Sequence, residues 1–349
     1  MNIYKIYKSL QKFGAVLLLL IALQNLNAFG IKYGNEFLKF GTGVRENSLG
    51  GAVISNSQPV VSAYWNPALL SRAADPEIQI MHTEEFAGVV NNDHVFVTLP
   101  GQRDFKFSAG FFRTGVDNIP ATENSLVEYG TQNGRLDADD RIDYEKISYF
   151  NASESAFFLA GSKPVYNNLS MGATFKTIHK NLYEKYAWGV GLDLGLFYEP
   201  FEGLMAGAVA RNITTTFLYW NDGEKEIVKP TLALGTSYNL LITPLKLKIT
   251  PLAGLDLNFT GKQYNTDLNI QSMNLRFRGG VEFEYREIFA IRTGQDDLGG
   301  IHLGCGLNTK YGNLDYGFAM GAGYSDLGNS HRVAITFKIN SLQQLIKNR

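Results

Sequence analysis

Apolar and polar residues alternate one by one along several stretches of this sequence. The clearest stretch is residues 275–286, LRFRGGVEFEYR. One side carries the apolar residues Leu275, Phe277, Val281, Phe283 and Tyr285. The other side carries the charged residues Arg276, Arg278, Glu282, Glu284 and Arg286. A period of two is typical of a β-strand with one apolar and one polar face, so the pattern predicts a chain built mainly from strands.

One predicted strand is long enough to cross a bilayer. In residues 186–200, YAWGVGLDLGLFYEP, large apolar residues recur at every second position from Trp188 to Tyr198, and glycines and Asp193 lie between them. Trp188 and Tyr198 would lie about 33 Å apart along a strand that rises ~3.3 Å per residue. A tilt of about 40° reduces that height to roughly 25 Å, which matches the apolar band of an outer-membrane barrel.

The connections between strands alternate in length. About fourteen strands can be placed, near residues 77–84, 93–99, 104–113, 154–162, 168–178, 186–198, 203–211, 231–239, 245–258, 274–285, 287–294, 300–309, 313–321 and 330–339. The even-numbered connections are short, whereas most odd-numbered ones are longer, such as 114–153, 212–230 and 260–273. Outer-membrane barrels have short periplasmic turns and longer outer loops. The sequence therefore predicts an all-β, transmembrane antiparallel barrel of about 14 strands.

Residues 1–28 have the layout of a signal peptide. Lys5, Lys8 and Lys12 precede an apolar run at 13–23, and cleavage would follow Ala28. The run is shorter than the ~20 residues of a membrane-spanning helix. We therefore expect an exported protein that enters the cell outer membrane through its strands, with an uncleaved anchor as the alternative.

Composition narrows the classes of partner and site. The 32 Lys and Arg residues balance 33 Asp and Glu residues, for a formal net charge of -1. Such a balance does not indicate a nucleic-acid partner. Cys305 is the only cysteine, which excludes an internal disulfide and a thiolate metal cage.

A different pattern precedes the first predicted strand. Residues 62–71, SAYWNPALLS, follow a glycine-rich stretch at 41–52. Asparagine is a good N-cap, and proline suits the first helical position. Asn66 and Pro67 therefore predict a short helical turn that runs through Leu70, with the aromatic residues Tyr64 and Trp65 just before it.

Three stretches make the chain similar to the PorV/PorQ family, whose members are outer-membrane proteins with a FadL-like barrel. These stretches are residues 41–71, 133–150 and 314–339. The resemblance implies a hatch or plug at 29–76, a barrel at 77–339 and a tail at 340–349. It departs from the family at its end, since such barrels commonly finish on an aromatic residue of the last strand, whereas here the tail follows Phe337.

The resemblance also implies a role for the motif at 62–71. A barrel of about fourteen strands is wider than its own side chains can fill, and a hatch would close the lumen. Its anchoring residues would be Tyr64, Trp65, Asn66 and Pro67. The alternative is that Trp65 belongs to an interfacial aromatic belt.

Candidate catalytic and metal chemistry is sparse. The five histidines form no recognised motif, so we expect no enzyme activity, no catalytic residues, no metal and no cofactor. An acidic loop at 137–145 has alternating carboxylates that suit Ca²⁺, but Arg141 occupies a ligand position, and a solvated charged loop is the preferred interpretation. Lumen-facing charges are predicted at Asp193, Arg276, Arg278, Glu282 and Glu284, either as a hydrated wall or paired with the plug or neighbouring strands.

Two classes of function fit these features. In the first, the barrel handles cargo, and the resemblance implies either FadL-like passage of hydrophobic small molecules or an accessory role in type IX protein secretion. In the second, it is a structural or adhesive surface barrel whose long outer loops bind partners. The expected partners are outer-membrane lipid, the barrel-assembly machinery, and hydrophobic small molecules or secretion-system proteins.

Overall fold

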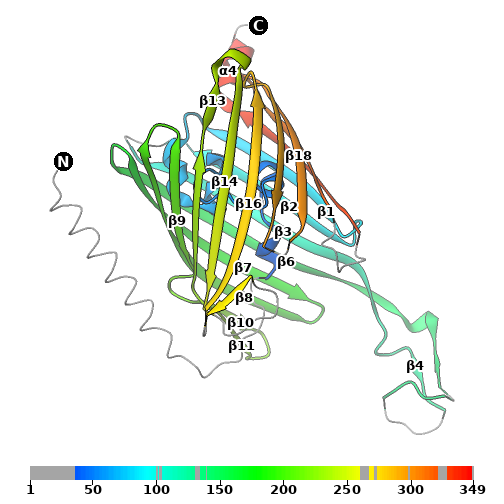
Figure 1. Ribbon diagram of the computed structural model, residues 1–349. Helices are drawn as coiled ribbons and strands as arrows, with labels where there is room; N and C mark the ends of the chain where they lie inside the picture. The colour runs from blue at the N-terminus through cyan, green and yellow to red at the C-terminus, as the bar shows by residue number, and fades with distance from the viewer. Residues whose placement is uncertain are drawn as a thin grey trace.

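The structure, a computed structural model, describes residues 36–347 except 100, 102–103, 130–133, 139, 260–266, 271–272, 298 and 321–327. The signal peptide predicted at 1–28 and the first part of the predicted hatch, 29–35, lie outside the described residues. From residue 77 onwards the chain winds into one closed antiparallel barrel (Figure 1).

Fourteen strands form the barrel wall, which confirms the predicted architecture. They are β1 (Glu77–Glu85), β2 (Val90–Leu99), β3 (Lys106–Ala121), β6 (Ser148–Tyr166), β7 (Leu169–Leu182), β8 (Lys185–Phe201), β9 (Leu204–Arg211), β12 (Thr231–Tyr238), β14 (Leu247–Asn258), β16 (Met273–Tyr285), β17 (Phe289–Gln295), β18 (Ile301–Asn308), β19 (Gly312–Ala319) and β20 (Ser330–Lys338). The ring closes where β1 pairs with β20, with Ile80 opposite Ile335. Closure leaves no free strand edge in the wall.

The two rims of the barrel differ, as the loop lengths predicted. The short-turn rim holds the turns at 167–168, 202–203, 286–288 and 309–311, together with β13 (Leu240–Ile242) and η6 (Thr243–Leu245). The long-loop rim holds the hairpin of β10 (Thr216–Trp220) and β11 (Lys225–Val228) and the short strand β15 (Leu268–Ile270), among others.

The longest predicted loop, 114–153, is shorter in the structure. β3 and β6 remain paired as far as Ala121 and Ser148, with one bulge after Val116, because each strand supplies the backbone hydrogen-bond partners of the other. The hairpin then continues through β4 (Leu126–Val127), β5 (Arg141–Ile142) and η5 (Tyr144–Lys146). Figure 1 shows this arm, whose described residues are 117–129, 134–138 and 140–150, projecting well beyond the long-loop rim.

The outer face of the wall is apolar. Along β8 the exposed residues Trp188, Val190 and Leu194 alternate with buried inward positions, as the sequence predicted. β20 exposes Val333, Ile335 and Phe337 in the same way. A continuous apolar surface around a closed barrel matches the outer face of a membrane-spanning barrel. No helix in the described part of the chain is long and apolar enough to cross a membrane.

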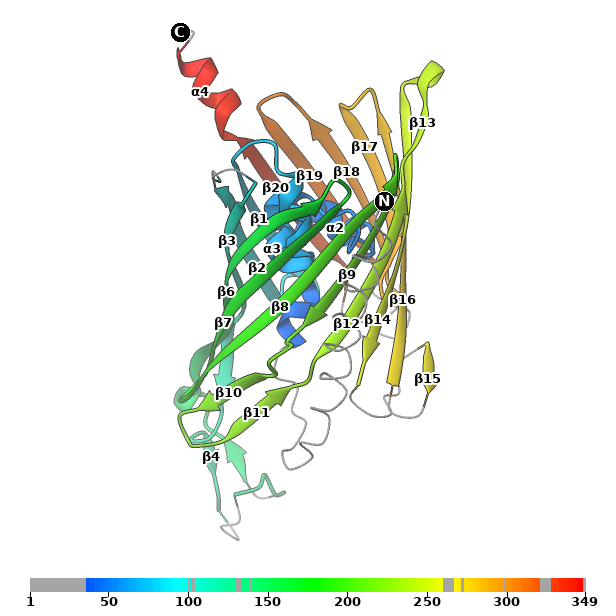
Figure 2. The same ribbon diagram turned by 90° about the vertical axis from the view of Figure 1, so that its left-hand side faces the viewer.

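Residues 36–76, called here the lumenal segment, lie inside the ring of strands (Figure 2). The segment consists of η2 (Glu36–Phe40), α2 (Val44–Ser48), η3 (Pro59–Val61), α3 (Ser62–Trp65) and η4 (Pro67–Arg72). At the other end of the chain the tail is helical, since α4 (Ile339–Lys347) follows β20 directly.

An arginine on the outer face of β8 should cost more stability near the middle of the strand than near its end. Leu194→Arg, near the middle of the strand, should lower the free energy of unfolding by about 2–4 kcal/mol, because an arginine would face the bilayer midplane. Tyr186→Arg, near the strand end, should cost only about 0–1 kcal/mol. Urea unfolding of the barrel in phospholipid vesicles measures both. Equal costs would contradict the proposed depth of the strand.

Candidate functional site: the lumenal segment and its seat

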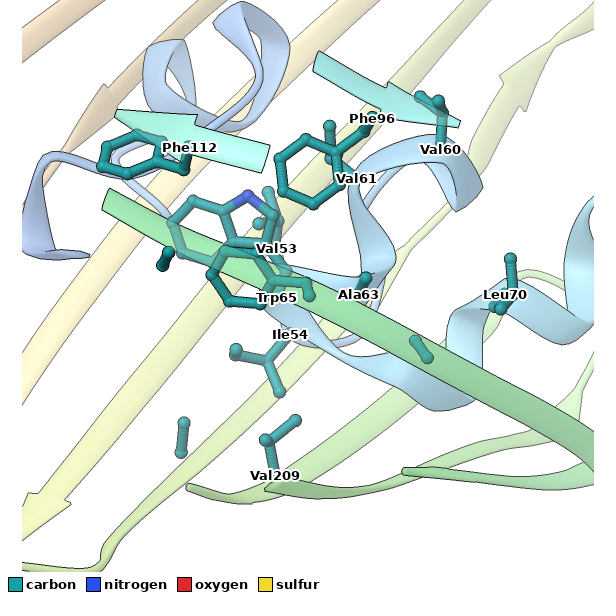
Figure 3. Close-up of a cluster of buried hydrophobic side chains, with 14 of the residues drawn as sticks. Val53, Ile54, Val60, Val61, Ala63, Trp65, Leu70, Phe96, Phe112 and Val209 are labelled. Atoms are coloured by element: carbon teal, nitrogen blue, oxygen red, sulfur yellow. The ribbon is translucent and has the colours of Figure 1, made fainter. Parts of the chain in front are cut away.

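The lumenal segment has its own apolar core, centred on Trp65. The Trp65 side chain is 4% exposed, and its indole nitrogen donates a hydrogen bond to the backbone oxygen of Thr42 at 2.7 Å. Figure 3 shows the indole among Val53, Ile54 and wall residues such as Phe112. Trp65 therefore packs inside the lumen rather than at a membrane interface.

Asn66 caps the helical turn η4, and it also ties the segment to the wall. Its side-chain oxygen accepts a hydrogen bond from the backbone nitrogen of Ala68 at 3.1 Å, and Pro67 occupies the first turn, as the sequence predicted. Its amide nitrogen donates to the backbone oxygen of Ile54 at 2.8 Å and to that of Leu196 on β8 at 3.0 Å. Both hydrogens and the oxygen of this buried amide therefore have hydrogen-bond partners.

The wall meets the segment along a belt of inward-facing glycines. The glycine belt consists of Gly172, Gly195, Gly207, Gly235, Gly254, Gly280, Gly294, Gly304 and Gly317, one on each successive strand from β7 to β19. Several members are directly opposite one another across the sheet, as Gly207 is to Gly235 and Gly280 to Gly294. The belt forms a groove in the wall without side chains.

Side chains are missing from the belt because the backbone of the segment occupies their space. A Cβ added to Gly207 would lie 2.1 Å from the backbone oxygen of Ile54, and one added to Gly294 would lie 2.2 Å from the carbonyl carbon of Leu49. At Gly195 the added atom would meet the side-chain oxygen of Asn66 at 2.2 Å. Glycine within a strand often marks the close approach of another backbone, and here that backbone belongs to the same chain.

Aromatic rings line the opposite sector of the lumen. This aromatic sector comprises Phe96 on β2, Phe112 on β3 and Phe158 on β6. The Tyr64 ring lies 5.9 Å from that of Phe158, and the Phe37 ring lies 6.1 Å from that of Phe112, centroid to centroid. Burial raises the pKa of Tyr64 to about 12, so its hydroxyl stays neutral.

An ion-pair chain fastens the segment to a third region of the wall. The Nε and Nη2 atoms of Arg45 donate to the two carboxylate oxygens of Glu282 on β16, at 2.9 and 2.8 Å. Glu282 also accepts from Arg292 on β17 at 2.7 Å, and Arg292 donates to Asp315 on β19 at 2.5 Å. Glu282, Arg292 and Asp315, called here the charged sector, form a linked row of alternating charges on the wall. Arg45 joins the segment to this row.

Two charged residues of the segment have perturbed pKa values. Burial alone would lower the pKa of Arg45, but the carboxylate of Glu282 outweighs it and raises the pKa above its usual value. Burial raises the pKa of Glu46, although Glu46 accepts a hydrogen bond from the backbone nitrogen of Gln58 at 2.8 Å. Arg45 therefore stays a cation. Ionisation of Glu46 costs free energy because its carboxylate is buried.

The other predicted lumen charges all lie on the inner wall in ion pairs with neighbouring residues. Asp193 accepts from Lys176 with both oxygens at 2.8 Å. Glu284 pairs with Lys248 at 2.9 Å. Arg276 and Arg278 share Asp297 at 2.8 Å each, and Arg278 also donates to the backbone oxygen of Gly50 in the segment at 3.4 Å.

Sequence reasoning missed several residues of this network. Three of them lie at inward positions of strands in which inward and outward residues alternate, namely Lys176, Arg292 and Asp315. A period-two analysis of each strand could have found them. Arg45 lies in the glycine-rich stretch and is separated from Glu282 by 237 positions. No local pattern indicates that pairing.

A cavity of about 720 Å³ lies between the segment and the short-turn rim. Arg45 and Gln58 line its inner end. More basic than acidic residues line it, namely Arg45, Lys246, Lys248, Arg286, Arg292 and Lys338 against Glu282, Glu284 and Glu287. The lumen on this side of the segment is therefore a polar, cationic mouth.

The acidic loop does not form a metal cluster among the residues that the structure describes. No group of three or more His, Cys, Asp or Glu side chains there is placed to hold an ion, and Asp139 lies outside the described residues. Asp140 accepts backbone hydrogen bonds from Tyr129 and Asp137 at 3.0 Å each. This carboxylate stabilises the β4–β5 hairpin.

Solved structures share this arrangement of strands. The toluene transporter TbuX of Ralstonia pickettii matches with a TM-score of 0.52 and 13% identity, over 86% of this chain and 99% of that one. The P. putida toluene transporter TodX matches with a TM-score of 0.51 and 12% identity, over 85% of this chain and 96% of that one. The chain has the fold of the FadL-like barrels. No protein-family model and no curated protein matches the sequence.

Substitutions at Asn66 should separate its two roles. If it acted only as a cap, Asn66→Asp would be tolerated and Asn66→Ala would cost about 1 kcal/mol. Because the amide also donates to two carbonyl oxygens, we expect Asn66→Asp to be the more damaging change, since a carboxylate would face those oxygens. Thermal unfolding of the detergent-solubilised barrel measures the order of the two variants. A fully stable Asn66→Asp protein would rule out the second role.

The glycine belt offers a matched pair of neighbours on β16. A Cβ at Gly280 would lie 2.6 Å from the backbone oxygen of Leu49, whereas one at Gly279 meets nothing within 4 Å. Gly280→Val should displace the segment at a cost of about 1–3 kcal/mol, and Gly279→Val should not. The readout is labelling of a cysteine at Ser57, in a Cys305→Ser background, by a water-soluble reagent. Equal protection of this cysteine from the reagent in both variants would contradict close packing of the segment against Gly280.

Proposed function

We propose that this protein is an outer-membrane barrel that passes small apolar molecules, with the lumenal segment as its hatch. In this proposal residues 1–28 are the export signal, the short-turn rim faces the periplasm, and lipid and the barrel-assembly machinery are its partners during insertion. The observation that carries the proposal is the uneven attachment of the segment, which is ion-paired on one side and packed against aromatic rings on the other.

The two attachments respond differently to an apolar guest. Breaking a buried ion pair such as Arg45–Glu282 costs about 3–5 kcal/mol, because it leaves an uncompensated charge. Contacts between Tyr64 or Phe37 and the aromatic sector are non-directional, and an apolar molecule can replace them with little loss. A guest would therefore slip between the segment and the aromatic sector while the charged sector holds the segment in the lumen.

This route favours small uncharged molecules. The aromatic sector offers ring faces and edges, and a charged guest would have to lose its hydration there without a partner. Two of the matching structures, TbuX and TodX, are toluene transporters, which agrees with this class of molecule.

Toluene uptake by vesicles containing the barrel tests the proposal. Phe158 and Phe157 are neighbours on β6, one inward and buried, the other outward and exposed. Phe158→Ala should raise toluene entry because it loosens the aromatic seal, whereas Phe157→Ala should leave it unchanged. Toluene entry that equals that of protein-free vesicles, for the native protein and for Phe158→Ala alike, would refute passage.

A second candidate is the accessory role in type IX protein secretion that the PorV/PorQ resemblance implies. The observation in its favour is the arm at 117–150, whose exposed residues include Tyr129, Tyr144 and Tyr149. Exposed aromatics are enriched at protein-binding surfaces, and an adhesive role would use the same residues. Removal of residues 122–147 should then change the set of secreted proteins or surface partners and leave toluene entry intact. An unchanged secretome and unchanged surface binding would exclude this candidate.

A further inference from the structure

The C-terminal helix α4 has a narrow apolar stripe. Its apolar residues are Ile339, Leu342, Leu345 and Ile346, and the rest of the helix is polar. Positions separated by three, four and seven residues share one face of an α-helix. The sequence therefore builds a helix with one apolar side at the very end of the barrel.

The stripe is only partly covered among the described residues, since Ile339 and Leu342 are half-buried. Leu345 is 38% exposed, and none of the buried apolar clusters in the described structure includes a residue of α4. Among the described residues, hydrogen bonds hold the start of the helix, where the backbone nitrogen of Ile339 donates to the oxygen of Pro76 at 3.0 Å and Asn340 donates to Asp75 at 2.6 Å. Figure 2 shows α4 extending beyond the short-turn rim, away from the mouth of the lumen.

The start of α4 lies at the edge of the apolar outer surface. Val333, Ile335 and Phe337 of β20 are exposed on that surface, and the helix begins two positions after Phe337. Two strand residues at ~3.3 Å each, tilted by about 40°, rise roughly 5 Å along the membrane normal. Amphipathic helices at a membrane surface bury their apolar face about 5–10 Å into the headgroup region, so α4 begins at a suitable depth.

The charge of the segment favours a phospholipid surface. Residues 339–349 contain Lys347 and Arg349 and no acidic residue. Basic side chains beside an apolar stripe are typical of helices that bind anionic lipid.

We propose that α4 lies in the phospholipid leaflet at the short-turn rim, with its apolar stripe toward the acyl chains and Lys347 among the headgroups. This inference requires the barrel to be in a bilayer, but it does not depend on what the barrel transports. It gives the barrel a fixed anchor beside the β1–β20 closure, where the first and last strands meet.

Two adjacent positions on the helix test the proposal in the full-length barrel. In a Cys305→Ser background, Leu345→Cys on the stripe and Gln344→Cys on the polar side each receive an environment-sensitive fluorophore. The proteins are reconstituted in phosphatidylethanolamine and phosphatidylglycerol vesicles, and heat-modifiable gel migration verifies that the barrel is folded. We expect lipid-borne doxyl quenchers to act mainly at position 345, and aqueous iodide to quench position 344 several-fold more strongly.

One result would overturn the inference, and another would assign the anchoring to the apolar stripe alone. Equal and strong iodide quenching at both positions would place α4 in water, free to meet a protein partner instead. Equal iodide protection of position 345 in phosphatidylcholine vesicles would remove the role of the basic residues. Neither result depends on toluene entry, so failure of the anchor and failure of the transport proposal remain distinguishable.

Discussion

The backbone of the lumenal segment touches the backbone of the barrel wall, and much of the interior follows from that contact. A ring of this size has a lumen that its own side chains do not fill, and here a second layer of chain occupies it. Where Ile54 and Leu49 pass closest, the wall has Gly207 and Gly294, because any Cβ there would overlap the segment. The inner surface of the barrel and the path of the segment are therefore one fitted shape.

Fitting alone does not hold the segment in place, since a glycine groove offers few directional contacts. The charged and aromatic sectors supply the rest, in different ways. Arg45 is fixed by geometry, because its Nε and Nη2 atoms donate to both carboxylate oxygens of Glu282, which in turn accepts from Arg292. Tyr64 contacts Phe158 through ring edges, an arrangement that tolerates small shifts. The segment thus has one firm side and one yielding side, which is the property that a hatch needs.

Patterns within single strands were enough to predict the wall, because each strand shows its two faces through period-two alternation, as β8 and β16 do. The cap of Asn66 was also predictable from the adjacent Pro67. The seat was not. The bond from Asn66 to Leu196 and the pairing of Arg45 with Glu282 join positions 130 and 237 residues apart, and only the closed ring brings them together. Strand pairing beyond the rim, in the arm at 117–150, was hidden because its residues lack alternation.

Glycine was the signal in the sequence that was easiest to misread. In residues 189–195 the glycines alternate with large apolar residues, and glycine within a strand usually weakens it. Three of them face the lumen, and Gly195 faces Asn66 itself. A column of inward glycines repeated on successive barrel strands therefore predicts a second backbone inside the barrel. The same smooth wall presents no side chains for the segment to climb over, so a hatch seated on glycine can shift without first unpacking the wall that holds it.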